Sequence, residues 1–199
     1  MTRAFIAVDL DSATRDILAR LTRRVARALP TARVVTPDSI HVTLAFLGEL
    51  DDQRVEDAIA ATREAAAGVA PFWLAPGRIG VFGPDQAPRV VWVGIEGQTG
   101  RLHALQRRLS HALDARGFTL DSKPFEPHLT LARLSTRLDE PSMLRLRQLR
   151  SEPPPRAESW KVDGLRVMRS DLSRAGARYT PLSIIPLGAP LQEPGDASI

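Results

Sequence analysis

The stretch His41-Val42-Thr43-Leu44 occurs a second time in the chain, as His128-Leu129-Thr130-Leu131, 87 residues later. The same offset relates several further identities without a gap, and one of them is a tryptophan, which is a rare residue in this chain. The matched pairs are Pro37 with Pro124, Ala45 with Ala132, Leu47 with Leu134, Trp73 with Trp160, and Gly77 with Gly164. Because agreement at one fixed spacing indicates a duplicated structural unit, we expect repeats over residues 1–87 and 88–174.

The hydrophobic pattern follows the same duplication. In each repeat a short apolar run typical of a buried strand precedes a segment with apolar residues at helical spacing, and a strand, a helix and a strand follow. Asp11 or Ser12 is placed to cap the first helix, Pro30 to end it, and Gly117 to end its counterpart. The expected strands are 4–8, 40–47, 72–82, 90–95, 128–134 and 160–169, and the expected helices around the tetrads run near 11–29, 52–67, 100–116 and 139–150.

This order of elements predicts an α/β or α+β protein, with two similar lobes related by an approximate two-fold axis. The two repeats leave a segment in which residues of about 178–186 are expected to add a closing strand. Residues 1–188 would then form a single bilobal domain. Residues 189–199 contain Pro190, Pro194 and Gly195 with few apolar groups, and we expect a flexible tail there.

The tetrads place two imidazoles and two hydroxyls where they can meet. In a strand, alternate side chains share a face, so His41 and Thr43 face one way while the apolar neighbours face the other. A two-fold axis would bring His128 and Thr130 to the equivalent place, so that one cleft holds both pairs. Since imidazole titrates near neutrality, such a pair can supply one general base and one general acid, as displacement at phosphorus requires. The threonine hydroxyls can donate hydrogen bonds to phosphoryl oxygens.

The chain contains four histidines, and the remaining two provide an internal comparison. His103 and His111 both lie in the helix expected at about 100–116, and neither has a histidine at its equivalent position in the other repeat. We expect them to be helix-surface residues without a catalytic role.

The composition excludes several classes of protein. With 43% hydrophobic and 25% charged residues, the chain has the proportions of an ordinary globular protein. It contains no cysteine, which excludes disulfides, thiolate nucleophiles and cysteine-ligated metal sites. We expect no membrane helix and no signal peptide, and therefore a cytoplasmic protein. A net charge of +4 is compatible with an anionic ligand but does not demand one, and the arginines of the first helix are better explained by a solvated outer face than by an RNA path.

These motifs resemble the two-histidine phosphoesterases, and among them the bacterial and archaeal RNA 2′,3′-cyclic phosphodiesterases, also called the 2′-5′ RNA ligase family. The resemblance extends beyond the tetrads and reaches nearly to the expected tail. It is carried by residues 3–8, 35–48, 89–94, 123–133 and 178–182. It implies an α+β fold with an antiparallel sheet and outer helices in each lobe, a catalytic cleft between the lobes, and no metal or other cofactor.

The resemblance also implies roles for individual residues. His41 matches the proton donor to the departing O3′, and His128 matches the base that activates water. Thr43 and Thr130 match the phosphate-binding hydroxyls, and Arg133 sits where the family places an arginine near the phosphate. The implied reaction opens a terminal 2′,3′-cyclic phosphate on RNA to a 2′-phosphomonoester, and we expect a monomer that binds such RNA ends and no membrane.

Several alternatives stay open at this stage. The same core would serve an enzyme that acts on a small cyclic nucleotide or on ADP-ribose cyclic phosphate. It could also join RNA ends through a 2′-5′ bond as a side activity. A non-catalytic RNA-binding module would have no use for paired tetrads. A metal-dependent hydrolase is disfavoured because the histidines of this chain lack the usual spacing of metal ligands. Phe46, Phe125 and Tyr179 are candidates for stacking on the terminal base, although packing is the simpler role for each.

Overall fold

The structure, a computed structural model, describes residues 1–173 and 176–188, and the predicted tail at 189–199 lies outside these residues. The described part contains four α-helices and one short 3-10 helix. The helices are α1 (Ser12–Ala28), α2 (Asp52–Ala66), α3 (Thr99–Asp114), α4 (Glu140–Ser151) and η1 (Pro37–Ser39). The strands are β1 (Thr2–Val8), β2 (Arg33–Val34), β3 (Val42–Leu50), β4 (Phe72–Phe82), β5 (Val90–Gly97), β6 (His128–Arg133), β7 (Trp160–Val162), β8 (Gly164–Ser173) and β9 (Gly176–Pro186).

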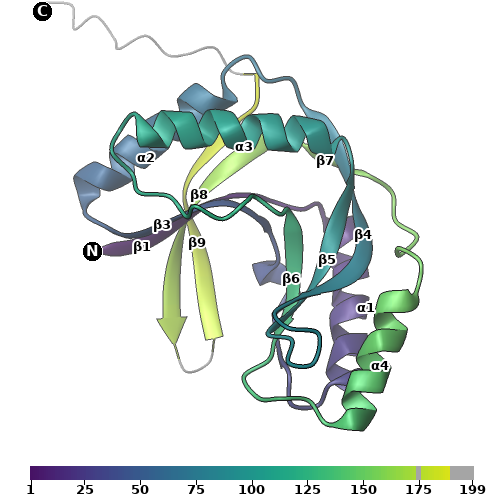
Figure 1. Cartoon of the computed structure of the whole chain (residues 1–199). Helices are drawn as coiled ribbons and strands as arrows, with labels where there is room; N and C mark the ends of the chain where they lie inside the picture. The colour runs from purple at the N-terminus through teal and green to yellow at the C-terminus, as the bar shows by residue number, and fades with distance from the viewer. Residues whose placement is uncertain (174–175, 189–199) are drawn as a thin grey trace, which may run out of the picture.

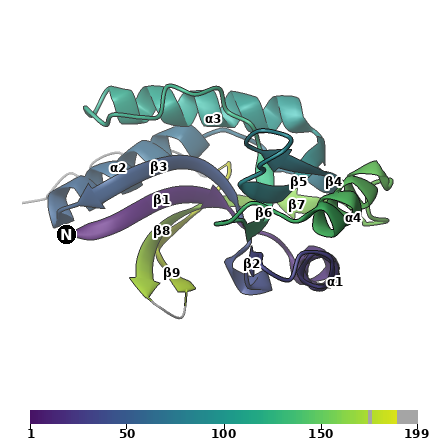
Figure 2. The same ribbon diagram turned by 60° about the horizontal axis from the view of Figure 1, so that its bottom comes forward.

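The strands form one strongly curved antiparallel sheet with helices on its outer side (Figures 1 and 2). Its order is β7-β4-β5-β6-β3-β1-β8-β9, and β2 pairs with β6 beside this path. Helices α2 and α3 pack together over the β1 and β3 side, whereas α1 and α4 pack at the β4 and β6 side. The predicted α+β class, with antiparallel pairing and outer helices, is therefore confirmed.

Helix starts and the hydrophobic core follow the sequence pattern closely. Asp11, Asp51 and Asp139 each accept a hydrogen bond from a backbone N–H in the first turn of their helix, at 2.8, 2.8 and 2.9 Å, which satisfies one of the unpaired donors there. The apolar face of α1 is buried at Leu18 and Val25. Among the described helices, none is long and apolar enough to cross a membrane.

The two halves of the sheet meet at a single bridge between Val42 and Leu129. These two residues are equivalent in the 87-residue repeat, so each pairs with its own counterpart. An antiparallel pair of equivalent residues is what a local two-fold axis produces. The axis therefore passes between the strands that carry the two tetrads, immediately beside His41 and His128.

The halves of the sheet do not coincide with the two repeats in the sequence. Strand β4, from the end of the first repeat, pairs with β5, and β8, from the end of the second, pairs with β1. In the same way α1 packs against β6, and α3 against β3. Each half is thus built from segments of both repeats, and the two halves are interlocked through the chain.

The strand expected at 160–169 is divided in two at Asp163. Before the break, β7 pairs with β4; after it, β8 pairs with β1 and β9. At the break Gly164 approaches the partner backbone closely, since a Cβ there would lie 3.0 Å from the carbonyl oxygen of Ile185. One apolar run therefore serves both halves of the sheet, and periodicity alone does not reveal such a change of partner.

Candidate active site

Both tetrad strands contain a β-bulge at the equivalent residue. Opposite β1, Thr43 pairs with Ala7 and Ala45 with Ile6, which leaves Leu44 as the extra residue. Opposite β5, the extra residue is Leu131, which is 87 positions after Leu44. A bulge inserts one residue into a strand and so reverses the alternation of faces beyond it.

This bulge explains how Arg133 comes to share a face with His128 and Thr130. In a regular strand, residue 133 would face away from residues 128 and 130, because the side-chain period is two. Here Leu131 and Ala132 are both buried in the core, and Arg133 is exposed on the tetrad side. The equivalent bulge in β3 exposes Phe46 to 65% beside its own tetrad. The concave face, which we define as the sheet face opposite the helices, therefore carries an arginine in one half and an aromatic ring in the other.

The two catalytic candidates are held by the same backbone contact. His41 Nδ1 lies 2.8 Å from the carbonyl oxygen of Ser39, and His128 Nδ1 lies 2.7 Å from that of Glu126. Since a carbonyl oxygen only accepts hydrogen bonds, each Nδ1 must carry the proton and donate it. Nε2 is then the nitrogen that can accept or deliver a proton in both rings.

Each imidazole also packs against aromatic rings. Phe5 stacks on His41 with ring centroids 4.6 Å apart, and Trp92 lies near His128 with centroids 6.2 Å apart. Tyr179 approaches His41 edge-on at 5.1 Å. Phe5 and Trp92 were not predicted from the sequence as site residues. A signal for them was present, since these two aromatic residues are themselves 87 positions apart.

Burial lowers the pKa of both imidazoles. Loss of solvent is the largest cause for His41, whose pKa falls to about 4 although the Ser39 carbonyl and the Asp9 carboxylate oppose the change. The positive charges of Arg15 and His128 lower the pKa of His41 further. For His128 burial again lowers the pKa, and the charge of Arg133 adds to this effect. Arg133 is therefore close enough to affect the pKa of His128, and His128 close enough to affect the pKa of His41.

An ion cluster beside His41 was not predicted from the sequence. The carboxylate of Asp9, at the end of β1, pairs with Arg15 of α1 and with Arg166 of β8, the latter at 2.5 Å. Arg15 also donates to the carbonyl oxygen of Pro37, which precedes the first tetrad. No repeat signal marks this cluster, because the equivalents of Arg15 and Arg166 are a leucine and an isoleucine.

The other sequence candidates occupy different environments. His111 is exposed on α3, as expected, but His103 is partly buried edge-on against Phe125, with centroids 5.2 Å apart. Phe125 also packs against the core. Of the three proposed stacking residues, Tyr179 and Phe46 lie near the first tetrad through Phe5, whereas Phe125 is engaged in packing.

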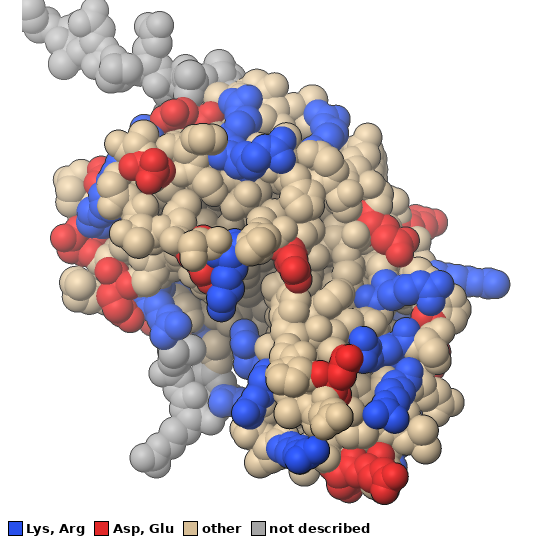
Figure 3. Space-filling view, viewed as in Figure 1, with Lys and Arg blue, Asp and Glu red and all other residues tan. Residues whose placement is uncertain are grey.

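The concave face is basic at its margins. Figure 3 shows Lys and Arg side chains around the hollow that lies between the β8–β9 hairpin and the β5 and β6 strands. Across residues 1–173 and 176–188, no three His, Asp or Glu side chains are grouped as metal ligands. The arrangement offers two imidazoles, two hydroxyls and cationic side chains, which together can bind an anion and move protons on either side of it.

Comparison with known proteins gives consistent results. A relative from Aeropyrum pernix, named RNA 2′,3′-cyclic phosphodiesterase, is 32% identical over 165 residues, which covers 83% of this chain and 92% of that protein. One of the same name from Geobacillus stearothermophilus is 37% identical over 129 residues, or 65% of this chain, and the match spans 41% of its length. The crystal structure of Escherichia coli LigT complexed with 3′-AMP superimposes with a TM-score of 0.72 at 27% identity, covering 94% of this chain and 99% of LigT.

The family assignment follows from these similarities and from a sequence model that spans both tetrads. Residues 28–174, most of the chain, match the model of the 2′-5′ RNA ligase superfamily. This range includes His41, Thr43, His128, Thr130 and Arg133. The chain belongs to the 2′-5′ RNA ligase superfamily.

Proposed function

We propose that this protein hydrolyses the 2′,3′-cyclic phosphate at the end of an RNA to a 2′-phosphomonoester, with His41 as general acid and His128 as general base. The observation that carries the proposal is the pair of imidazoles at equivalent positions about the Val42–Leu129 bridge, each with Nδ1 bound to a backbone carbonyl. The names of the curated relatives support this substrate.

The reaction is an in-line displacement at phosphorus. Nε2 of neutral His128 takes a proton from water, and the water oxygen forms a bond to phosphorus. The bond from phosphorus to O3′ breaks on the opposite side, and Nε2 of protonated His41 donates its proton to O3′. The bond to O2′ is kept, so the product is a 2′-phosphomonoester. One proton enters at His128 and one leaves at His41, and a proton exchange with solvent restores the enzyme.

Negative charge on the phosphoryl oxygens is met by hydrogen-bond donors of the same face. Thr43 and Thr130 lie two residues after their histidines on the same face of the strand, and their hydroxyls donate to the non-bridging oxygens. Arg133, brought onto this face by the bulge, adds a cation in the half that contains the base. Preorganised donors of this kind stabilise charge that develops in the transition state.

The acid must first acquire a proton, since the pKa of His41 in the free protein is about 4. A bound phosphate carries a negative charge beside the ring and favours the charged imidazole, so substrate binding raises this pKa. Asp9 acts in the same direction. Protonation of His41 is therefore coupled to substrate binding.

The product tests this proposal directly. A short RNA with a 2′,3′-cyclic phosphate end, incubated with the protein and excess EDTA, should give a 2′-phosphate end identified by phosphorus NMR. Since the chemistry needs no metal, the rate should not change when the chelator is added. A 3′-phosphate product would reverse the assigned leaving group, and absence of turnover by folded protein would refute the activity.

The same site is expected to run slowly in the joining direction. An RNA 5′-hydroxyl would take the place of water at His128 and attack the cyclic phosphate, which yields a 2′-5′ bond. High concentrations of both RNA ends favour this product, and gel electrophoresis would detect it. Failure to recover joined RNA under these conditions would remove the side activity without affecting hydrolysis.

A further inference from the structure

Strand β2 brings a second arginine onto the face that carries the tetrads. Arg33 lies directly opposite Arg133 in the antiparallel pairing of β2 with β6, and the amide of Val35 donates to the carbonyl oxygen of Leu131 at 2.8 Å. Residues directly opposite each other in antiparallel strands share a face, with Cα atoms about 5 Å apart. Arg33 therefore lies on the concave face beside Arg133.

These two arginines form a pair of like charges without a compensating partner. Within residues 1–173 and 176–188, neither makes an ion pair or a side-chain hydrogen bond, and both are exposed. Some other arginines are paired, since Arg24 binds Glu152 and Arg166 binds Asp9. Like charges directly opposite in a sheet are destabilising. An anion held between the two guanidinium groups would reverse this cost.

The position of the pair relative to the tetrad indicates which anion it binds. Arg133 follows Thr130 by three residues, which is at most about 10 Å along a strand at roughly 3.3 Å per residue. Both arginine side chains can span part of this distance toward the phosphate held by the threonines. Arg133 is thus near the reacting phosphate, and Arg33, on the neighbouring strand, lies at a distance that an adjacent nucleotide of the same RNA can bridge.

We propose that Arg33 and Arg133 together bind the internal phosphodiester that joins the terminal nucleotide to its neighbour, so that the site selects RNA ends over cyclic mononucleotides. The inference rests on the proposed function, because it places this phosphodiester relative to the reacting cyclic phosphate. Planar guanidinium groups suit the task, since each can donate two parallel hydrogen bonds to phosphate oxygens. Arg33 supplies the part of this site that does not touch the reacting phosphate.

The smallest pair of substrates that tests the inference differs by one phosphodiester. Adenosine 2′,3′-cyclic phosphate contains no internal phosphodiester between nucleotides, whereas the dinucleotide ApA with the same cyclic end contains one. Arg33→Gln should lower kcat/KM for the dinucleotide about tenfold, mainly through KM, because a charged hydrogen-bond donor is lost. The mononucleotide rate should not change. The dependence of the dinucleotide reaction on salt should also weaken, by about 0.7 in the logarithmic slope.

Arg23→Gln is the matched control, because Arg23 is exposed on α1 and makes no ion pair within the described residues. It removes the same charge and should leave both substrates unaffected. An equal effect of Arg33→Gln on the two substrates, or no effect on either, would overturn the inference. Circular dichroism would verify that each variant is folded.

A binding measurement separates this inference from the proposed activity. ApA with a 2′-phosphate end and adenosine 2′-phosphate cannot be hydrolysed by the proposed reaction, and calorimetry gives their affinities directly. Weaker binding of the dinucleotide alone by Arg33→Gln supports the paired-arginine site even where wild-type protein turns over neither cyclic substrate. Unchanged dinucleotide binding in a protein that does turn over both substrates refutes the site and leaves the activity standing.

Discussion

At the scale of single residues, each of the two proposed catalytic histidines, His41 and His128, is fixed from three sides. A carbonyl oxygen two residues earlier fixes Nδ1, aromatic rings fix the ring plane, and the strand fixes the Cα position. Fixed rings are expected where proton transfer requires a defined geometry. The same burial that fixes the rings also lowers both pKa values, so the well-defined ring positions come with a smaller protonated fraction at neutral pH.

The lowered pKa values predict an acidic optimum for kcat/KM, which reports the free enzyme. In the proposed mechanism the productive form carries one proton on the histidine pair, and both pKa values lie below the ordinary 6.5. At pH values above both pKa values, the fraction of enzyme with a proton on the histidine pair falls about tenfold per pH unit. Steady-state kinetics should therefore show kcat/KM decreasing from pH 7 to pH 9. The decrease in kcat should begin at a higher pH than the decrease in kcat/KM, because bound phosphate raises the pKa of His41. A kcat/KM that increases from pH 6 to pH 8 would contradict this protonation scheme.

Gly80 makes room for the aromatic support of His128. It lies opposite Trp92 in the pairing of β4 with β5, and a Cβ at Gly80 would lie 2.2 Å from the indole Cη2. Gly80→Ala must therefore displace the indole, and with it the packing around His128. We expect kcat to fall by about tenfold to a hundredfold, as small misplacements of catalytic groups do, while KM changes little.

Gly100→Ala provides the control for this substitution. Gly100 lies in α3, and a Cβ there has no neighbour within 4 Å. The substitution Gly100→Ala should leave kcat unchanged and raise the free energy of unfolding slightly, by about 0.5 to 1 kcal/mol, since alanine favours the helix. If Gly80→Ala kept full kcat, the indole would have no role in positioning His128.

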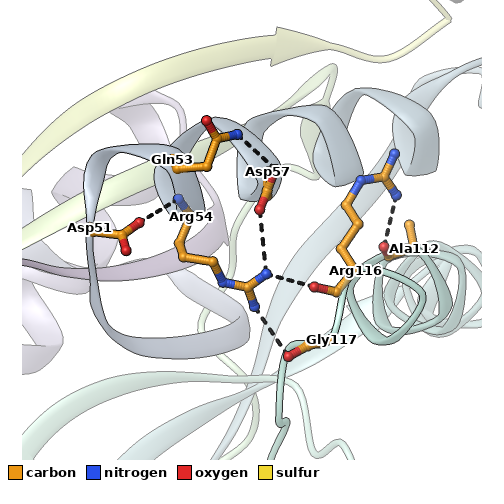
Figure 4. A network of polar contacts seen from close by, with 7 residues as sticks. All are labelled: Asp51, Gln53, Arg54, Asp57, Ala112, Arg116 and Gly117. Carbon is orange, nitrogen blue, oxygen red and sulfur yellow. Dashed lines mark hydrogen bonds and ion pairs between the residues drawn. The ribbon is translucent and has the colours of Figure 1, made fainter.

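At the scale of elements, Arg54 joins α2 to the loop that leads to His128 (Figure 4). Its guanidinium group donates to the carbonyl oxygens of Arg116 and Gly117, at 2.6 and 3.2 Å, and also pairs with Asp57. It lies 3.7 Å above the ring of Phe118. One side chain thus provides hydrogen-bond donors to the carbonyl groups that follow α3. It also anchors the start of the segment 118–127, which supplies the carbonyl group that accepts from His128.

Arg54→Ala should consequently lower the free energy of unfolding by about 1 to 3 kcal/mol, because the partly buried carbonyl group of Arg116 and the exposed one of Gly117 lose a charged donor. Chemical denaturation followed by circular dichroism would measure the change. Arg107→Ala is the control, since Arg107 is exposed on α3 and makes no side-chain contact of this kind among the described residues; its effect should stay within about 0.5 kcal/mol. Equal stability of the two variants would show that the network contributes nothing.

At the scale of the whole molecule, duplication and exchange of segments produce one site from two repeats. Because β4 and β8 cross to the opposite half, neither repeat closes its half of the sheet alone. The two tetrads face each other across an axis that the chain itself holds in place. The equivalent positions then diverge, with Phe46 in one half and Arg133 in the other, so that the two histidines differ in environment.

The sequence predicts the parts of this molecule that depend on local pattern. The offset of the tetrads and the element order follow from spacing and residue type, and so does the start of α1, where Asp11 is the cap among the two candidates Asp11 and Ser12. It does not predict which strands pair, because the apolar pattern of β4 and β8 would suit a place in either half of the sheet. The bulge that turns Arg133 onto the concave face and the contacts of Asp9 with Arg15 and Arg166 depend on tertiary register, which no local pattern encodes.

In the proposed mechanism, both repeats contribute an essential imidazole to one reaction. Single-turnover hydrolysis of an RNA with a 2′,3′-cyclic phosphate end should be compared among wild type, His41→Ala, His128→Ala and His111→Ala. We predict a loss of about a hundredfold to ten-thousandfold for each tetrad variant, and no change for His111→Ala, whose imidazole is exposed on α3. A wild-type rate in either tetrad variant, shown to be folded by circular dichroism, would contradict the two-histidine mechanism.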